Sequence, residues 1–119
     1  MKRRVAYIYD PEIETYNFGP DHPMKPKKVA MTHDIIEKSD LLPYMDLYKP
    51  PKVTKNYLTS YHSEEYIDYM ENYFDVEELY LGVKKFGIGL TMDTPAFPKM
   101  YDFCKTIGGA ALIASELLI

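Results

Sequence analysis

The strongest constraint on the fold of this chain is that only one of its segments has the composition of a β-strand. Residues 5–9 are Val-Ala-Tyr-Ile-Tyr, mostly β-branched or aromatic, and Asp10-Pro11 ends the run. A single strand cannot make a sheet, because its backbone N–H and C=O groups need partners. The sequence therefore predicts an α/β fold, mostly helical with one N-terminal strand, as an incomplete domain over residues 1–119. A complete all-α domain with an unusual first segment is the alternative.

Helical patterns occupy most of the rest of the chain. Pro26 suits the first position of a helix, and Ser63 offers a hydroxyl cap to another. Residues 10–25 and 41–55, which are rich in polar residues and proline, are predicted to be irregular. The predicted helices run from Pro26 to about Ser39, from Ser63 to about Phe74, over 76–85, and from about Pro98 to the last residue.

Two of these helices carry apolar residues on more than one side. The apolar residues of the helix after Pro26 spread over more than one face, which predicts that it is covered on two sides. The final helix is apolar nearly all round after Ile107, which predicts neighbours on every side. Within it, Gly108-Gly109 lowers helix stability, and close packing against another element is the expected compensation.

The charge of the chain excludes one broad class of function. The net formal charge is −4, and the sequence pI is about 5.3. Residues 1–60 carry ten Lys/Arg against eight Asp/Glu, whereas residues 61–119 carry four against ten. Domains that bind nucleic acid are usually strongly basic, so no direct DNA binding is expected.

The number of cysteines and the lengths of the apolar runs indicate the cellular compartment. Cys104 is the single cysteine, so no disulfide can form within the chain, which suits the nucleus or the cytosol. Val5–Tyr9 is too short to serve as a secretory signal. Thr106–Ser115 is the longest uncharged stretch, and it is too short for a bilayer, which needs about 20 apolar residues. No membrane partner is therefore expected.

The sequence does not contain the motifs of a complete active site. The three histidines match no metal-ligand spacing, and packing or capping roles are expected for His33 and His62. No glycine-rich phosphate loop is present. Three polar segments still indicate possible binding surfaces: 19–28, 61–66 and 92–97. In the last of these, Asp93 is either a turn former or an acceptor for the backbone N–H groups of a bound peptide.

The order of these segments and the residues within them resemble the N-terminal third of a class I histone deacetylase. The resemblance covers nearly the whole chain, and its most specific parts are the runs His-Pro-Met-Lys-Pro and His-Ser-Glu-Glu-Tyr-Ile-Asp. The matching segments, in order, are 5–10, 19–26, 31–33, 61–68, 93–97, 101–104 and 108–109.

This resemblance implies a fold and a reaction. The fold is a large α/β domain of the arginase/deacetylase type, with a parallel sheet covered by helices on both faces. The reaction is zinc-dependent hydrolysis of Nε-acetyl-lysine in histones and other proteins, in which the metal polarises the amide carbonyl and its bound water. The zinc ligands, the histidine pair and the oxyanion-stabilising tyrosine of the family match no residue of this chain.

Several residues match positions with known roles in the family. Asp93 matches the rim aspartate that holds the substrate backbone. Met24 and Lys28 match positions that line the inner cavity behind the active site. Lys25 matches a residue that helps to bind inositol phosphate at the corepressor interface, where Asn17 and Asp21 are neighbouring positions.

The chain also departs from the family pattern at some of these places. Lys28 stands where arginine is usual, so the charge is kept but the planar two-pronged donor is lost. Asp21 stands where glycine is usual, and an acid there would repel a phosphate, which weakens the case for inositol phosphate binding. Asn17 replaces an aromatic residue or histidine, and Thr94 replaces a cysteine. These changes indicate a divergent member.

The leading hypothesis is therefore a piece of a histone deacetylase that acts in the nucleus, with the cytoplasm as the second compartment considered. Such a protein would act on acetylated histone tails and join corepressor proteins in transcriptional repression, and this piece alone is expected to be inactive. Two alternatives come from other classes of function. One is a non-catalytic module that keeps the corepressor surface, and the other is a deacetylase of small molecules such as acetylpolyamines.

Overall fold

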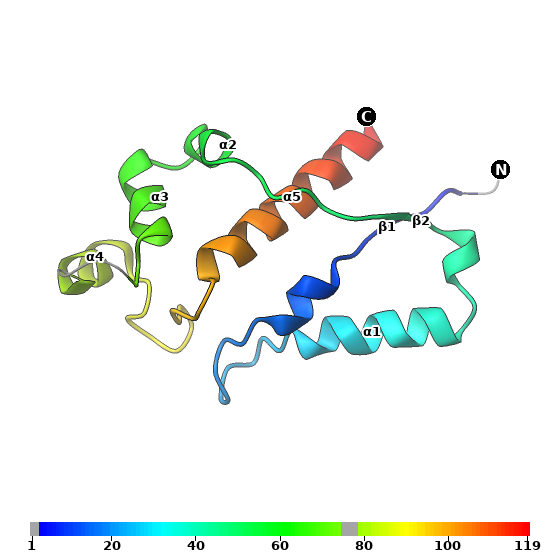
Figure 1. Ribbon diagram of the computed structural model, residues 1–119, viewed down its shortest axis with the longest axis horizontal. Helices are drawn as coiled ribbons and strands as arrows, with labels where there is room; N and C mark the ends of the chain where they lie inside the picture. The colour runs from blue at the N-terminus through cyan, green and yellow to red at the C-terminus, as the bar shows by residue number, and fades with distance from the viewer. Residues whose placement is uncertain (1–2, 75–78) are drawn as a thin grey trace.

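The computed structural model describes residues 3–74 and 79–119. These residues form two short strands, two 3-10 turns and a set of α-helices, with α5 lying diagonally through the molecule (Figure 1). The principal extents of the molecule are 55 × 34 × 19 Å. The elements in chain order are β1 (Ala6–Ile8), η1 (Pro11–Thr15), α1 (Lys27–Lys38), η2 (Leu42–Tyr44), β2 (Asp46–Tyr48), α2 (Lys55–Thr59), α3 (Glu64–Glu71), α4 (Leu79–Phe86) and α5 (Met100–Leu118).

The first strand is not alone, and this corrects the prediction of a single strand. β1 pairs in parallel with β2, with Ala6 opposite Asp46 and Ile8 opposite Tyr48. The prediction failed at β2 because that strand is three residues long, begins with an aspartate, and lies in a proline-rich stretch. Pairing with β1 therefore supplies the strand conformation that local propensity does not. The parallel pairing agrees with the expected α/β class.

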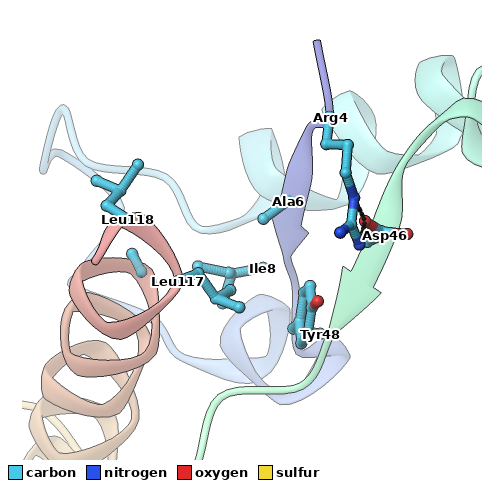
Figure 2. A pocket seen from close by; sticks show the side chains of 8 residues that line it. Arg4, Ala6, Ile8, Asp46, Tyr48, Leu117 and Leu118 are labelled. Carbon is cyan, nitrogen blue, oxygen red and sulfur yellow. Dashed lines mark hydrogen bonds and ion pairs between the residues drawn. The ribbon is translucent and has the colours of Figure 1, made fainter. Parts of the chain in front are cut away.

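Helices lie on both faces of β1. On one face the ring of Tyr9 stacks on His33 of α1, with the ring centroids 3.7 Å apart, and the hydroxyl of Tyr7 lies 3.1 Å from Nδ1 of His33. On the other face Ala6 and Ile8 point toward the end of α5 (Figure 2). Successive side chains of a strand alternate between faces, so one strand holds both helices. The packing role expected for His33 is confirmed.

A groove of about 440 Å³ remains between β1 and the last turns of α5 (Figure 2). Ala6, Ile8, Ala114 and Leu117 are among the residues that line it. The bonds from the N–H of Asp46 to the carbonyl of Val5, and from the N–H of Tyr9 to the carbonyl of Tyr48, place β2 along one edge of β1. In this parallel ladder the backbone groups of Ala6 and Ile8 face the opposite edge, within the plane of the sheet.

The predicted helices are largely confirmed, with differences at their ends and on their faces. Ser63 caps α3 by accepting a hydrogen bond from the N–H of Tyr66, as expected, but α3 ends at Glu71. Part of the predicted helix over 76–85 lies outside the described residues, and the observed helix runs to Phe86. The prediction that α1 is covered on two sides is wrong, since Met31 is 57% and Ile35 64% exposed.

Two short elements were not predicted from the sequence. η1 begins after Asp10, whose side chain accepts a hydrogen bond from the N–H of Glu12 at 2.9 Å. α2 begins after Thr54, whose hydroxyl accepts from the N–H of Tyr57 at 3.2 Å. Both are single-turn or near single-turn elements with a side-chain cap, so the capping residue rather than an apolar period defines them.

The paired glycines of α5 pack closely, as predicted. Gly109 is buried, and a Cβ built on it would overlap the backbone carbonyl of Pro51. A Cβ at Gly108 would lie 3.1 Å from a methyl of Val53. The N–H of Val53 also donates to the carbonyl of Lys105 at 3.2 Å. Glycine thus lets the segment after β2 lie directly on α5.

The main buried core lies around the start of α5, away from the strands. Its members come from the loop after η1, from α3, from the segment between α4 and α5, and from α5 itself: Tyr16, Tyr69, Met70, Tyr73, Ile88, Phe97, Met100 and Phe103. In the part of the chain described here, no helix combines the length and the apolar character that crossing a membrane requires.

Candidate functional site

A cavity of about 200 Å³ opens at one side of this core. We call it the aromatic cavity. Almost all of its accessible lining is apolar, and its walls come from four separate parts of the chain. The residues that line it are Phe18, His22, Tyr66, Met70, Ile88, Asp93, Thr94, Pro95, Phe97, Met100, Phe103 and Cys104.

Aromatic rings form the floor of the aromatic cavity. The centroid of the Phe18 ring lies 4.4 Å from that of Phe97 and 5.2 Å from that of Phe103. His22 stacks on the other side of this group, with its ring 5.3 Å from Phe18. Phe97 and Met100 are 5% and 4% exposed, so the wall is firmly packed from behind. Offset and edge-to-face pairs of this kind stabilise the arrangement beyond their buried area.

Asp93 is carried to the cavity by a closed loop between α4 and α5. The N–H of Gly89 donates to the carbonyl of Thr94 at 2.5 Å, and the hydroxyl of Thr94 donates to the carbonyl of Gly87 at 2.7 Å. Gly87 and Gly89 have φ values of 77° and 78°, which glycine adopts without strain. Within 3–74 and 79–119 the exposed carboxylate of Asp93 makes no ion pair, so it can accept hydrogen bonds from a ligand.

His22 is held by its own loop. The Nδ1 atom of its ring accepts a hydrogen bond from the N–H of Met24 at 3.0 Å, which assigns the proton of the neutral ring to Nε2. Half-buried against Phe18, the imidazole adds a donor to an otherwise apolar wall. His22 and Asp93 therefore bring one donor and one acceptor to the cavity from two different loops.

Cys104 contributes a thiol to the same cavity. Burial raises the pKa of this thiol above its ordinary value, so at neutral pH it is a neutral, weakly polar group. Burial likewise raises the pKa of the neighbouring Tyr66, with a further contribution from Cys104. Cys104 and Tyr66 therefore add no charge to the cavity wall at neutral pH. The expectation that Cys104 behaves as a small apolar residue agrees with this placement.

The two residues expected to line an inner cavity do not meet Asp93 in this structure. Met24 is 50% exposed. Lys28 lines a shallow pocket beside Tyr7 and Tyr9, and its ammonium donates to the carbonyl of Pro23 at 3.3 Å. Neither side chain lines the aromatic cavity.

Lys25 and Asn17 share a separate pocket, of about 350 Å³. The ammonium of Lys25 donates to the carbonyls of Gly19 and Pro20, at 3.2 and 2.5 Å. The side-chain oxygen of Asn17 accepts from the N–H of Gly19 at 2.8 Å. Asp21 does not line this pocket, and the carboxylate of Glu14 does. Both polar side chains thus hold the loop, and the pocket is lined by Lys27 as well as by Glu14.

The phenylalanines that line the aromatic cavity were not predicted from the sequence. Phe18 and Phe103 were not singled out, because an aromatic residue in a loop or a helix is usually a core residue. Phe97 lies in a segment that was noted for Asp93 alone. The sequence contains one signal for these phenylalanines: aromatic residues occur in the same segments as the polar motifs.

A sequence model of the histone deacetylase domain matches residues 22–119. The chain belongs to the histone deacetylase family. The matched range contains Asp93 and most of the aromatic cavity, but not Phe18. The resemblance predicted from the order of the motifs is therefore confirmed.

Curated histone deacetylases match the chain over nearly its whole length. "Histone deacetylase HDAC1" of Drosophila melanogaster is 34% identical over 119 residues, covering 98% of this chain and 22% of that protein. "Probable histone deacetylase 19" of Zea mays is 35% identical over 115 residues, or 94% and 22%. "Histone deacetylase RPD3" of Saccharomyces cerevisiae is 34% identical over 113 residues, or 93% and 26%. The chain thus spans about a quarter or less of the length of these relatives.

Histone deacetylases are zinc-dependent in general, so we tested whether this chain offers a site for the metal. Across residues 3–74 and 79–119, no three His, Cys, Asp or Glu side chains gather closely enough to hold an ion. Cys104 lies among aromatic side chains, and Asp93 is exposed on its loop. The described residues do not fit a zinc site of the usual three or four ligands, and we derive no metal-dependent step from them.

Proposed function

We propose that this chain is part of a larger histone deacetylase domain of the arginase/deacetylase type, in which it supplies a substrate-holding surface. The whole protein would hydrolyse the amide of Nε-acetyl-lysine in histone tails. The observation that carries the proposal is the match to the histone deacetylase domain over residues 22–119. The short length of the chain relative to its relatives is the reason for assigning the chemistry to the larger protein.

The exposed apolar surface of the chain supports the proposal that it is part of a larger domain. The groove lies between one face of β1 and β2 and the last turns of α5, where Leu118 is 88% exposed, and within the described residues β1 is paired along one edge only. The outer side of α1 leaves Met31 and Ile35 more than half exposed. Surfaces of this kind are commonly covered in the intact fold, since open strand edges and apolar patches promote association. We propose that further elements of the domain cover both.

Asp93 is the residue that we propose to hold the substrate. Its carboxylate would accept hydrogen bonds from backbone N–H groups of the peptide, which are charge-assisted and stronger than neutral ones. Its exposed position in a loop closed by Gly89 and Thr94 supports this role. A carboxylate also favours a basic peptide, as a histone tail is.

The other matched residues take more distant roles in this proposal. Met24 and Lys28 would line an inner cavity that the rest of the domain completes. Lys25, with Asn17 and Asp21, would lie at the interface with corepressor proteins. Binding of inositol phosphate there is the weakest part of the proposal, because Glu14 lines the same pocket and Lys25 already bonds to two carbonyls. The proposed setting is the nucleus, in transcriptional repression.

The test is an activity measurement on protein expressed from the complete reading frame that contains this sequence. Zinc-dependent hydrolysis of an acetyl-lysine histone peptide would support the proposal. Hydrolysis of acetylpolyamine without hydrolysis of the peptide would replace it by the small-molecule function. A protein with no zinc and no hydrolysis that still binds a corepressor would replace it by a non-catalytic interaction module.

A further inference from the structure

The loop that carries Asp93 is anchored at both ends but exposed in its middle. At its start, the N–H of Gly87 donates to a carbonyl of α4 at 2.8 Å, and beyond its end Phe97 is 5% exposed. Between these points, residues 89–94 are all exposed, so burial of side chains does not fix them. The position of Asp93 therefore depends on hydrogen bonds within the loop.

Thr94 makes the hydrogen bonds that close this loop. Its carbonyl accepts from the N–H of Gly89 at 2.5 Å, and its own N–H donates to the carbonyl of Thr91 at 3.3 Å. Its hydroxyl donates to the carbonyl of Gly87 at 2.7 Å, across seven residues of sequence. Because Gly87 is itself bonded to α4, the hydroxyl of Thr94 ties the end of the loop that carries Asp93 to its anchored start.

The hydroxyl at position 94 distinguishes this chain from the usual family pattern. Thr94 stands where a cysteine is usual, and a thiol is only a weak hydrogen-bond donor. Because Asp93 and Thr94 are adjacent, a bond that fixes Thr94 also limits the freedom of the Asp93 carboxylate. A group that is held in place before binding loses less conformational entropy when the ligand arrives.

We propose that Thr94 is a positioning residue, whose hydroxyl holds Asp93 in place for the backbone of a peptide substrate. This inference rests on the proposed function, because it takes Asp93 as the residue that holds the peptide. Loss of one neutral hydrogen bond of this kind corresponds to about a fivefold change in an equilibrium constant. Asp93 would contact the peptide backbone and not the reacting amide, so the loss raises KM for the peptide and leaves kcat unchanged.

The test compares variants of the protein expressed from the complete reading frame. Thr94→Val removes the hydroxyl and keeps a β-branched side chain. We expect it to raise KM for an acetyl-lysine histone peptide about fivefold, with kcat, zinc content and melting temperature unchanged. Thr94→Ser keeps the hydroxyl and should have the KM of the wild type. A Thr94→Ser variant as impaired as Thr94→Val would overturn the inference, since the hydroxyl then has no role.

Thr91→Val is the matched control. It removes the neighbouring hydroxyl, which lies 3.3 Å from that of Thr94, and it leaves the bond between Thr94 and Gly87 in place. We expect the KM of this variant to equal that of the wild type. A rise in KM as large as that of Thr94→Val would overturn the inference, because any loss of polarity in the loop would then have the same effect.

A double-mutant cycle shows whether Thr94 acts through Asp93. In the Asp93→Ala background, Thr94→Val should have no further effect on KM, because the carboxylate that the hydroxyl positions is gone. A peptide with methyl groups on the backbone nitrogens beside the acetyl-lysine gives the same comparison from the side of the substrate. Its KM should not respond to Thr94→Val. Additive effects of the two substitutions would overturn the inference.

Hydrogen exchange separates this inference from the proposed function. The N–H groups of residues 89–94 should exchange faster in Thr94→Val than in the wild type, since the bonds that close the loop open more often. Faster exchange together with a raised KM supports the inference. Unchanged exchange, or an unchanged KM while Asp93→Ala raises it, overturns the inference and leaves the role of Asp93 intact. An unchanged KM in Asp93→Ala means that the proposed role of Asp93 fails, and the inference fails with it.

Discussion

Gly109 of α5 lies directly against the backbone carbonyl of Pro51, so close that a Cβ at position 109 would overlap that oxygen. The contact joins the segment after β2 to α5, which lies on the face of β1 away from α1. It therefore fixes the position of α5 relative to the sheet. A glycine inside a helix normally lowers stability by about 1 kcal/mol relative to alanine. At this position the close approach of two backbones outweighs that cost.

Replacement of Gly109 tests this contact. We expect Gly109→Ala to destabilise the protein by about 3 kcal/mol, because the backbone at Pro51 must move to admit the methyl group. The neighbouring Gly108→Ala is the matched control, since its Cβ would meet only a movable methyl of Val53 at 3.1 Å. Urea unfolding should show a large loss for the first variant and little change for the second. Equal losses would mean that helix geometry, not the contact with Pro51, sets the requirement.

The contacts of Tyr9 lead to a second prediction. Its hydroxyl donates to the carboxylate of Glu14, and its ring stacks on His33. Burial of the ring and the hydrogen bond to Glu14 raise the pKa of Tyr9 to about 12. We expect Tyr9→Phe to cost about 1 kcal/mol, because the hydrogen bond is lost while the stacking remains. Tyr9→Leu should cost more, since it also removes the aromatic contact with α1.

Thermal unfolding of these variants gives the comparison. Tyr61→Phe is the control, because Tyr61 is 88% exposed and its replacement should leave the melting temperature unchanged. If Tyr9→Phe and Tyr9→Leu unfold at the same temperature, the stacking on His33 contributes nothing measurable to the docking of α1.

The buried thiol of Cys104 gives a prediction that depends on pH. The thiolate is the species that reacts with iodoacetamide, and burial raises the pKa of this thiol in the folded chain. The unfolded chain therefore releases its proton at lower pH than the folded chain. As the pH rises above the ordinary thiol value, stability falls, since the unfolded state then binds fewer protons. The rate of alkylation should reach its midpoint at higher pH in buffer than in urea. Coincident pH profiles would mean that the thiol is not buried.

Exposed apolar residues near the end of α5 predict association of the isolated chain. Leu118 is 88% exposed and lines the groove beside β1 with Ala6 and Ile8. We expect the chain to self-associate in sedimentation or light scattering, and Leu118→Lys to reduce that association. Glu116→Gln is the control, because it changes the net charge by the same +1 at an exposed position without removing apolar surface. A wild-type chain that stays monomeric at high concentration would contradict the proposal that these surfaces are covered in the intact domain.

Much of the fold could be predicted from the sequence, because local patterns define it. Pro26 as a helix start, the cap at Ser63 and the apolar composition of the last helix predicted α1, α3 and α5, with differences of a few residues at their ends. β2 could not be predicted in this way, since Asp46-Leu47-Tyr48 becomes a strand only beside β1. The apolar residues of α1 lie on more than one face, so two covered faces were predicted. Composition alone does not show whether the element that covers a face lies within these 119 residues.

The candidate site was predictable only in part. Asp93 was singled out because it matches a family motif, whereas a carboxylate in a loop marked by glycine and proline is by itself an ordinary turn residue. The aromatic cavity could not be found, since Phe18 and Phe103 lie far apart in the sequence and meet only through the packing of α5. A pocket made by tertiary contact leaves no spacing in the sequence to detect.

The most direct test of the account is the effect of Asp93→Ala on protein expressed from the complete reading frame. Hydrolysis of an acetyl-lysine histone peptide and bound zinc are measured together for the wild type and the variant. We expect kcat/KM for the peptide to fall about tenfold or more, because hydrogen bonds to the peptide backbone are lost, while the zinc content stays unchanged. Unchanged peptide kinetics in Asp93→Ala, or a zinc-loaded wild type that does not hydrolyse the peptide, would contradict the account.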